Sequence, residues 1–438
     1  MILALAISLP LSAHSGFDYA KTDLPNGLTL LTVEDHYSPL VSVLVMYHVG
    51  VKNDPSGKTG ITKLCQQTIL EGTESFSRND YSRAIQSGGG TIGTLVGLDV
   101  TYFASKFPAD ILDTVLVMEI DRMRNIDFTY EKLLLAKKIL RQERMSEMES
   151  RLYGPLEMEL FNAAYRAYPY RNTPFGWPGD VDNIAPEHVK EHYKKYFQPG
   201  NAVMIIIGDF KTEAVVERVK KLADWFPSGG APEPVSVAEP EHRWERSSTM
   251  IGRGDVPVFI TGYIVPPIGH PDIPALMALD QIANKGESSR LFRHMVADLG
   301  LSMHTGGGLH FMEGPGIFIF WSIMNFDSPL AEGEEELFSE LERLKKEPVF
   351  SEELTKAKNQ IKANYYRLLT TLDRRAYRLG YYYMVMGDSD FGEKLTAQIQ
   401  SVTAEDIMRV AQEYLKQSNR TTVRMEPGET GAEILREE

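Results

Sequence analysis

The stretch Val181-Asp-Asn-Ile-Ala-Pro-Glu-His-Val189 decides the fold, because it returns 218 positions later as Ile399-Gln-Ser-Val-Thr-Ala-Glu-Asp-Ile407. The same separation relates Asn201 to Asn419, and each asparagine precedes a run with the composition of a strand. A single offset that is kept across separate blocks is the signature of an internal repeat. The sequence therefore predicts two copies of a unit of about 218 residues.

Two glycine triplets, Gly88–Gly90 and Gly306–Gly308, are also 218 positions apart. Neither continues into the G-K-[ST] pattern of a phosphate-binding loop. The prediction at both triplets is instead a tight bend after a helix.

A proline-rich segment separates the two units. Residues 227–240 hold four prolines and two glycines in fourteen positions, a composition typical of an extended linker. The predicted organisation is an N-terminal unit at 17–226, a linker at 227–242 and a C-terminal unit at 243–438.

Each unit mixes predicted strands with predicted helices. Residues 27–33 and 40–47 are rich in β-branched residues, and residues 91–103 alternate between apolar and polar, as strands do. Apolar residues at helical spacing predict helices at 111–124 and 130–148. Because the strands come in runs rather than in strict βαβ alternation, the predicted fold class is α+β, with two repeated sheet-and-helix sandwich units.

Composition narrows the classes of partner. The 438 residues carry a net charge of −14, which argues against nucleic acid and anionic membranes as partners and favours basic ones. Cys65 is the only cysteine, so no internal disulfide can form. Its apolar neighbours at helical spacing predict a buried thiol.

The N-terminus carries a predicted targeting segment. An apolar run at 2–13, followed by small residues, predicts a secretory signal at 1–15 and export to the periplasm. The run is too short to span a bilayer, and it lacks the basic residues that usually precede such a run. The alternative is a chain that keeps this segment and stays in the cytoplasm. No other segment is apolar enough to predict a membrane span.

The pattern that bears most directly on function lies in Gly60-Ile-Thr-Lys-Leu-Cys-Gln-Gln-Thr-Ile-Leu-Glu-Gly-Thr73. It resembles the zinc helix of the pitrilysin/insulinase-type (inverzincin) metallopeptidases, whose motif is H-x-x-E-H. In that family two histidines on one helical face bind zinc, and the glutamate between them activates water. Here Lys63 and Gln67 stand at the histidine positions, and Gln66 stands at the position of the base. The resemblance therefore implies a degenerate site, because an ammonium has no lone pair for zinc and an amide cannot take a proton from water.

Other stretches similar to this family extend from about Tyr19 to the C-terminal region. They are Asn26-Gly-Leu28, Gln142-Glu-Arg144, Tyr168-Pro-Tyr170 and Gly286-Glu-Ser-Ser-Arg-Leu-Phe292. The resemblance implies two such units per chain in a clam arrangement, with zinc as the cofactor of active members.

One acidic ligand of the family is retained. Glu143 stands 80 residues after Lys63, at the spacing of the family's third zinc ligand, whereas a nearby position that is often acidic in active relatives is Ala136. We expect no bound metal, and we hypothesise that the Lys63 ammonium pairs with Glu143 in place of zinc. A buried carboxylate needs such a compensating charge to remain ionised. The alternative is that both side chains reach solvent and never meet.

The family's second catalytic device is also missing. Active relatives carry an arginine and a tyrosine in the C-terminal unit that hold the substrate backbone and polarise its carbonyl. The matching positions hold Val296 and Met303, and neither side chain can donate a hydrogen bond.

A second H-x-x-E-H pattern, His188-Val-Lys-Glu-His192, lacks a glutamate at the spacing of the third ligand. We interpret it as the start of an ordinary helix, with Pro186 in its first turn.

These observations predict a non-catalytic subunit of a pitrilysin/insulinase-type peptidase. It would form a heterodimer with an active zinc-bearing family member, or a homodimer, and would help to enclose peptide substrates. Two alternatives stay open at this point. One is a stand-alone peptide-binding protein, and the other is an active zinc metalloendopeptidase with atypical ligands.

Overall fold

The computed structural model describes residues 18–149, 153–224 and 230–428. The predicted signal segment at 1–15 and the first positions of the predicted linker lie outside the described residues. Within the described part, no helix combines the length and apolar character that crossing a membrane requires.

The first sheet belongs to the N-terminal unit. Its strands lie in the order β1 (Ala20–Asp23), β2 (Thr29–Glu34), β6 (Ala202–Gly208), β3 (Leu40–Tyr47), β5 (Thr101–Pro108) and β4 (Thr91–Val96). Only β2 and β6 pair in parallel among these strands. The central strand β6 is buried along its whole length, as expected for a strand covered on both faces. At the other side of the sheet, β4 is an edge strand with alternating exposure.

The second sheet has five strands and repeats this arrangement without a counterpart of β1. Its order is β7 (Arg246–Gly252), β11 (Arg420–Pro427), β8 (Val258–Val265), β10 (Gly316–Met324) and β9 (Ser302–His310). Again a single parallel pair, β7 with β11, stands among antiparallel neighbours. The α+β fold class with two repeated sheet-and-helix units is therefore confirmed.

The offset of 218 residues holds for the strands at the centre of each sheet. Strands β3 and β8 begin at Leu40 and Val258, and the helices α7 (Pro186–Tyr196) and α14 (Ala404–Tyr414) also keep this separation. The glycine triplets keep this offset in the sequence but lie in different structural elements. Gly88–Gly90 precede β4 as predicted, but Gly306–Gly308 lie inside β9, so the predicted bend there is wrong. Glycine is needed at Gly307 because a Cβ would meet the carbonyl oxygen of Ile319 at 2.1 Å.

Two other boundaries differ from the sequence expectation. The single strand predicted at 91–103 is a hairpin of β4 and β5, because the chain turns at Gly97–Val100. The helix predicted at 130–148 ends as α4 at Arg144 and continues as a short π-helical segment, Met145–Glu149.

One face of each sheet is covered by helices of the same unit. In the N-terminal unit these are α1 (Ile61–Leu70), α2 (Arg78–Gln86), α3 (Leu112–Arg122), α4 (Tyr130–Arg144), α6 (Pro178–Asn183), α7 and α8 (Thr212–Ala223). In the C-terminal unit they are α9 (Ile273–Asn284), α10 (Leu330–Lys346), α11 (Ser351–Leu368), α13 (Phe391–Ser401) and α14.

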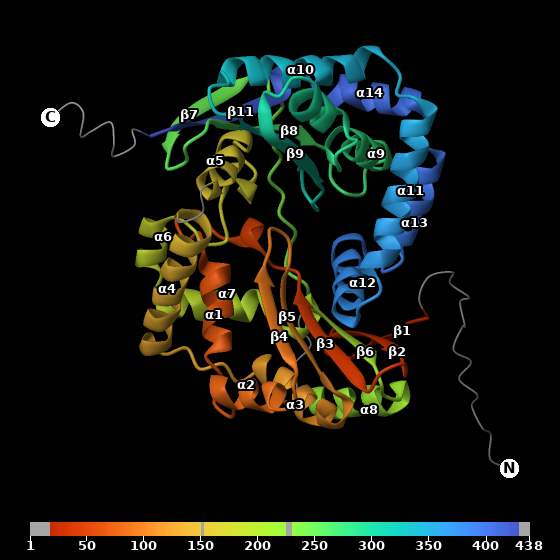
Figure 1. The fold of residues 1–438 in the computed structure, drawn as a ribbon. Coiled ribbons are helices and arrows are strands. Elements are labelled where there is room, and N and C mark those ends of the chain that lie inside the picture. Colours follow the sequence, from red (N-terminus) through yellow and green to blue (C-terminus); the bar gives the residue numbers. More distant parts are fainter. Residues whose placement is uncertain (1–17, 150–152, 225–229, 429–438) are drawn as a thin grey trace.

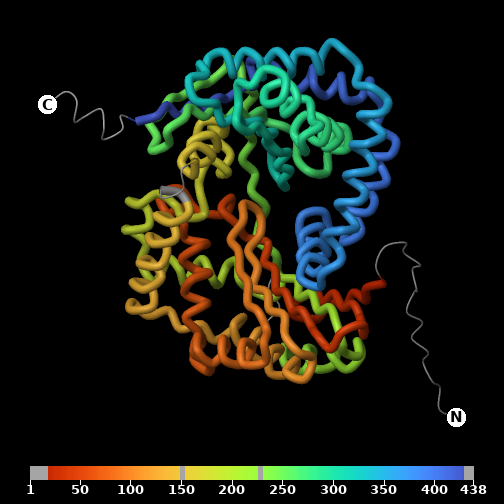
Figure 2. Tube along the Cα trace, viewed as in Figure 1, coloured from red at the N-terminus to blue at the C-terminus, as the bar shows by residue number. Residues whose placement is uncertain are grey.

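The opposite face of each sheet is covered by a helix of the other unit. Helix α12 (Leu372–Met386) packs Ala376 and Leu379 on the first sheet, and α5 (Gly154–Ala164) packs on the second. Their first residues are 218 positions apart, so the exchanged helices are repeats of one another. Gly380 allows the close approach of α12, because a Cβ there would lie 2.7 Å from Ile205. Figures 1 and 2 show this exchange, with α12 in blue against the first sheet and α5 in yellow against the second.

Candidate functional site

Helix α1 is held at its N-terminus by a buried carboxylate. Gly60 caps the helix in the left-handed region, with φ of 84°. The Asp54 carboxylate accepts hydrogen bonds from the backbone N–H of Gly60 (2.6 Å) and of Thr62 (3.1 Å). These contacts satisfy N–H groups that the first turn of a helix leaves free.

The face of α1 that carries positions 63 and 67 points at α4. Lys63 Nζ lies 3.1 Å from Glu143 Oε2, and Gln67 Nε2 donates to Glu143 Oε1 at 2.8 Å. The Lys63 side chain is 14% exposed and that of Glu143 is 35% exposed. Lysine and glutamine therefore fill the space around this carboxylate, one on each oxygen. The contact that the pairing hypothesis requires is present in the structure.

Gln66, at the position where the resembled family has its catalytic base, is buried and hydrogen-bonded. Gln66 has no exposed surface, and its Nε2 donates to Thr94 Oγ1 on the edge strand β4 at 2.6 Å. Its Oε1 has no hydrogen-bond partner in the part of the chain that the structure describes. This amide links α1 to β4 and has no basic group to offer to a water molecule.

The donor set around Glu143 does not fit zinc. Zinc sites in proteins are built from thiolate, imidazole and carboxylate ligands, and Glu143 is the one such group at these three positions. Across residues 18–149, 153–224 and 230–428, no group of three or more His, Cys, Asp or Glu side chains is placed to hold a metal ion. The thiol of Cys65 is buried, and burial raises its pKa.

The two positions in the C-terminal unit lie close in sequence to β9. Val296 is half-buried on the π-helical segment Phe292–Asp298, and Met303 is 40% exposed on β9. The nearby His294 is hydrogen-bonded to Glu336 at 2.8 Å. Neither Val296 nor Met303 supplies a donor for a substrate carbonyl.

The second H-x-x-E-H pattern lies on α7 and serves the helix itself. His188 Nδ1 accepts the N–H of Ala185 and so caps the first turn. His192 is buried against α1, with Nε2 at 2.9 Å from Thr62 Oγ1, and that hydroxyl donates to Asp54 Oδ1. Burial lowers the pKa of His192 to about 3, so its ring is neutral at pH 7.

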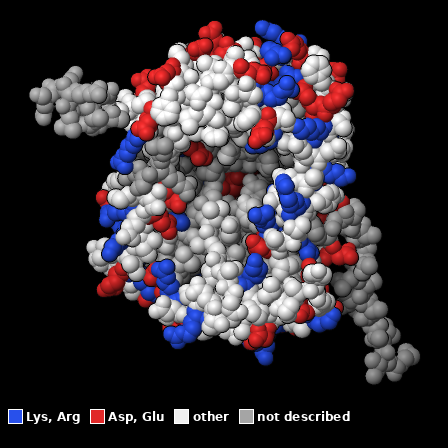
Figure 3. All heavy atoms as spheres, viewed as in Figure 1, with Lys and Arg blue, Asp and Glu red and all other residues white. Residues whose placement is uncertain are grey.

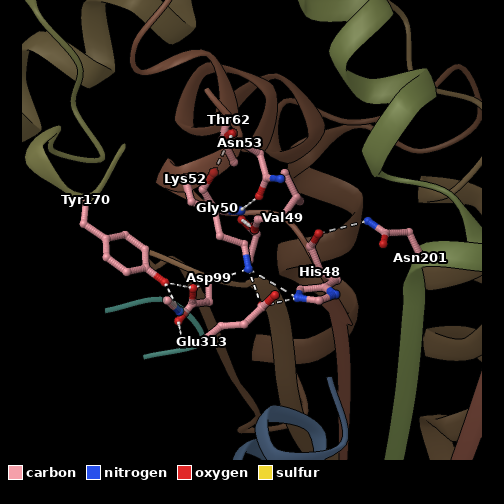
Figure 4. Close-up of polar contacts among 12 residues, drawn as sticks. His48, Val49, Gly50, Lys52, Asn53, Thr62, Asp99, Tyr170, Asn201 and Glu313 are labelled. Atoms are coloured by element: carbon pink, nitrogen blue, oxygen red, sulfur yellow. Dashed lines mark hydrogen bonds and ion pairs between the residues drawn. The ribbon is translucent and has the colours of Figure 1, made fainter. Parts of the chain in front are cut away.

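A charged cluster of buried and half-buried side chains joins the two units, and no sequence pattern indicated it. Lys52 Nζ lies 3.4 Å from Asp99 Oδ1 and also pairs with Glu313, while His48 Nε2 lies 2.5 Å from Glu313 Oε2. The hydroxyl of the buried Tyr170 donates to Asp99. Figure 4 shows these side chains converging from both units. We call these five residues the junction cluster.

In the junction cluster, burial and neighbouring groups act in opposite directions on the pKa of Glu313. Burial alone would raise the pKa of Glu313, but the hydrogen bonds and charges of His48 and Lys52 hold that pKa at about 2. The side chains of Lys52 and Asp99 are each 3% exposed. The backbone of the second unit takes part as well, because the N–H of Glu313 donates to Asp99 Oδ2 at 3.1 Å. The sequence offers no signal for this cluster, because its members come from segments with no fixed spacing.

Comparisons with known proteins identify relatives of both units. Residues 29–176 match the family described as Insulinase (Peptidase family M16), and residues 183–361 match the one described as Peptidase M16 inactive domain. The chain is 26% identical over 433 residues to a Helicobacter pylori protein named zinc protease PqqE, with 97% of each chain covered.

Solved structures of related proteins have the same fold over most of this chain. The crystal structure of a protease from Helicobacter pylori superposes with a TM-score of 0.88 at 25% identity, and the match covers 93% of this chain and 99% of that one. A peptidase M16 inactive domain from Pseudomonas fluorescens gives a TM-score of 0.85 at 16% identity, covering 94% and 98% of the two chains. At that identity the second match supports the fold alone.

Proposed function

Because this chain belongs to the pitrilysin/insulinase-type (M16) peptidase family, we propose that it is a non-catalytic subunit that helps an active, zinc-bearing partner to enclose peptides. Zinc is the cofactor of the family's active members, so the partner would supply the metal and the base. The proposed assembly is a heterodimer of exported proteins.

The observation that carries this proposal is the occupation of both Glu143 oxygens by Lys63 and Gln67. A vacant ligand set would favour metal uptake, whereas an ammonium in contact with the carboxylate competes with a cation for the same place. The loss of donors at Val296 and Met303 points in the same direction. A shared fold does not establish an activity, so the proposal rests on the side chains at the site.

The space between the units supports a role in peptide binding. A cavity of about 510 Å³ lies between the first sheet and α12, and the edge strand β4 forms one wall of it. Figure 3 shows a hollow between the two units. An exposed edge strand presents unpaired backbone groups, to which an extended peptide can add as a further strand.

The test is purification of the tagged chain from its native source, under conditions that preserve complexes. We expect an M16 relative with an intact zinc motif to copurify, and we expect chelator-sensitive peptidase activity in the complex and none in the isolated chain. Recovery of the monomer or homodimer alone would contradict the heterodimer. Chelator-sensitive activity of the pure chain would overturn the non-catalytic role.

The stand-alone peptide-binding protein is the second candidate, and the cavity beside β4 favours it equally. Tight peptide binding by the pure chain, with no partner in the native source, would select it. Export is tested separately by cell fractionation and by sequencing the N-terminus of the mature protein.

A further inference from the structure

We propose that the space between the two units contains a site for the C-terminal carboxylate of a peptide, with Arg378 as the cation that binds it. The inference rests on the proposed function only in taking the ligand to be a peptide. It requires neither a partner chain nor zinc.

The site is a cavity of about 310 Å³ at the meeting point of the units. Its walls are residues 95 and 97–100 from the hairpin of β4 and β5, residues 309–312 from the end of β9 and just after it, and part of α12. Leu95, Tyr377 and Arg378 also line the neighbouring cavity beside β4, so the two spaces adjoin. Most of the lining side chains are apolar or aromatic, as in sites for small ligands.

Arg378 is the unneutralised cation of this cavity. It is half-buried, and its Nη1 donates to the hydroxyl of Tyr382 at 3.0 Å. Among the described residues, no carboxylate forms an ion pair with Arg378, whereas Arg375 one turn away pairs with Asp35 at 2.8 Å. A guanidinium held among aromatic rings is suited to bind a carboxylate through two parallel hydrogen bonds.

The other charged groups of the lining do not neutralise Arg378. The Asp99 carboxylate is engaged by Lys52, by Tyr170 and by the N–H of Glu313. Burial lowers the pKa of His310, so this imidazole is neutral at pH 7.

The adjoining cavity is lined by two more cations, Lys106 and Arg374, and one carboxylate, Asp373, which lies 3.7 Å from Lys106. Basic groups are therefore in excess here, although the whole chain carries a charge of −14. Figure 3 shows Lys and Arg atoms on the side of the hollow where α12 lies. The sequence-based preference for basic partners does not apply to this site.

The geometry favours a chain end over an acidic side chain. The inner wall of the 310 Å³ cavity consists of two turns, and the junction cluster ties these turns together behind it. An extended peptide that enters along β4 therefore ends against this wall. Its last side chain would contact the apolar lining, and its terminal carboxylate would reach Arg378.

The test measures binding to the isolated, metal-free chain by fluorescence anisotropy. Three labelled hexapeptides are compared. Two share one sequence that ends in leucine, one with a free C-terminal carboxylate and one with a C-terminal amide. The third also ends in leucine amide, but one internal residue is replaced by glutamate. We expect the free acid to bind at least tenfold more tightly than both amides. We expect Arg378→Gln to abolish that difference, and Arg367→Gln, at an exposed arginine of α11, to preserve it.

Equal binding of the free acid and its amide by the unmodified chain would overturn the proposal, as would failure of all three peptides to bind. Preference for the peptide with internal glutamate would overturn the assignment to a chain end. These readouts do not depend on Arg378→Gln folding. They also leave the heterodimer untested, so failure of this site and failure of the proposed function are distinguishable.

Discussion

Lys63 supplies, between α1 and α4, the positive charge that a metal ion supplies in active members of the family. Its ammonium contacts one oxygen of Glu143, and Gln67 contacts the other. The carboxylate thus keeps two partners after the loss of both histidines. At the scale of single residues, an ammonium and an amide compensate this carboxylate, so it is not left without a partner.

Substitution of Lys63 by alanine tests this pairing. We expect the free energy of unfolding to fall by about 1–3 kcal/mol, less than the loss of a fully buried pair costs, because about a third of the Glu143 side chain is exposed. Urea unfolding at pH 7 measures the effect, with Lys138→Ala on the exposed face of α4 as control. An unchanged stability of Lys63→Ala would contradict the pairing.

His192 makes stability dependent on pH. The pKa of this ring is about 3 in the folded chain and ordinarily 6.5, so below pH 6.5 the unfolded chain binds a proton that the folded chain does not. This contribution to the free energy of unfolding therefore falls as the pH drops from 6.5 towards 3, by up to about 1.4 kcal/mol per pH unit. Burial raises the pKa of the neighbouring Asp54 to about 7, which acts in the opposite direction.

The measurement for His192 is a series of urea unfolding curves between pH 4.5 and pH 7.5. We expect His192→Gln to take up one proton fewer on unfolding than the unmodified chain, which appears as a shallower loss of stability towards acid. His304→Gln, at an exposed histidine of β9, is the control. Parallel pH profiles for His192→Gln and the unmodified chain would contradict the assignment.

The degree to which sequence predicted these residues follows from their spacing. Lys63, Gln66 and Gln67 share a helical face, and Glu143 stands at a spacing known from the family, so the sequence was enough to locate these positions. Residues of the junction cluster could not be located in this way, because their segments meet only when the two units pack. Arg378 was equally hidden, since its lack of a carboxylate partner is a property of the folded chain.

At the scale of elements, α1 and α4 retain the relative placement that a metal site needs. One carboxylate of α4 contacts both positions of α1 at which the family has histidine. The same scale shows where the repeat is strict and where it has drifted. Helices α7 and α14 keep the offset of 218 residues, whereas β4 and β9 occupy matching edges with different lengths and different glycine positions. Edge strands have a neighbour on one side only, so insertions there disturb fewer contacts.

The retained placement predicts that a zinc site can be restored. We expect the triple variant Lys63→His, Gln66→Glu, Gln67→His to keep one zinc ion per chain after loading and exhaustive dialysis, and the unmodified chain to keep none. Metal analysis measures this, and adding Glu143→Gln to the triple variant should abolish retention. Zinc retained by the unmodified chain and lost in Glu143→Gln would show that Glu143 binds zinc without the two histidines of the family motif.

At the scale of the whole molecule, the junction cluster fixes how the two units face one another. Lys52 stands between the carboxylates of Asp99 from the first unit and Glu313 from the second. Removal of its charge leaves two acidic groups facing each other in a buried place. Lys52 therefore adds a charged contact between the units to the packing of the exchanged helices α5 and α12.

We expect Lys52→Met to lower the free energy of unfolding by about 3–5 kcal/mol at pH 7, the range for breaking a buried ion pair. The double variant Lys52→Met, Glu313→Gln should recover part of this loss, because the repulsion is removed. Urea unfolding measures both, and small-angle X-ray scattering follows the separation of the units. A loss no larger than that of Lys190→Met, at an exposed lysine of α7, would refute the role of the cluster.

The exchange of α5 and α12 has a consequence for how this duplicated protein can change. Each copy seats one of its own helices on the sheet of the other, so an excised copy would expose a bare apolar face and carry a helix with nowhere to pack. Neither half can be replaced alone by the corresponding half of a relative unless the seat for the exchanged helix is replaced with it. Conversely, a chain cut between residues 224 and 230 should remain one particle, and the two pieces made separately should become soluble only when they are produced together. Each repeat therefore needs the other in order to bury its own sheet.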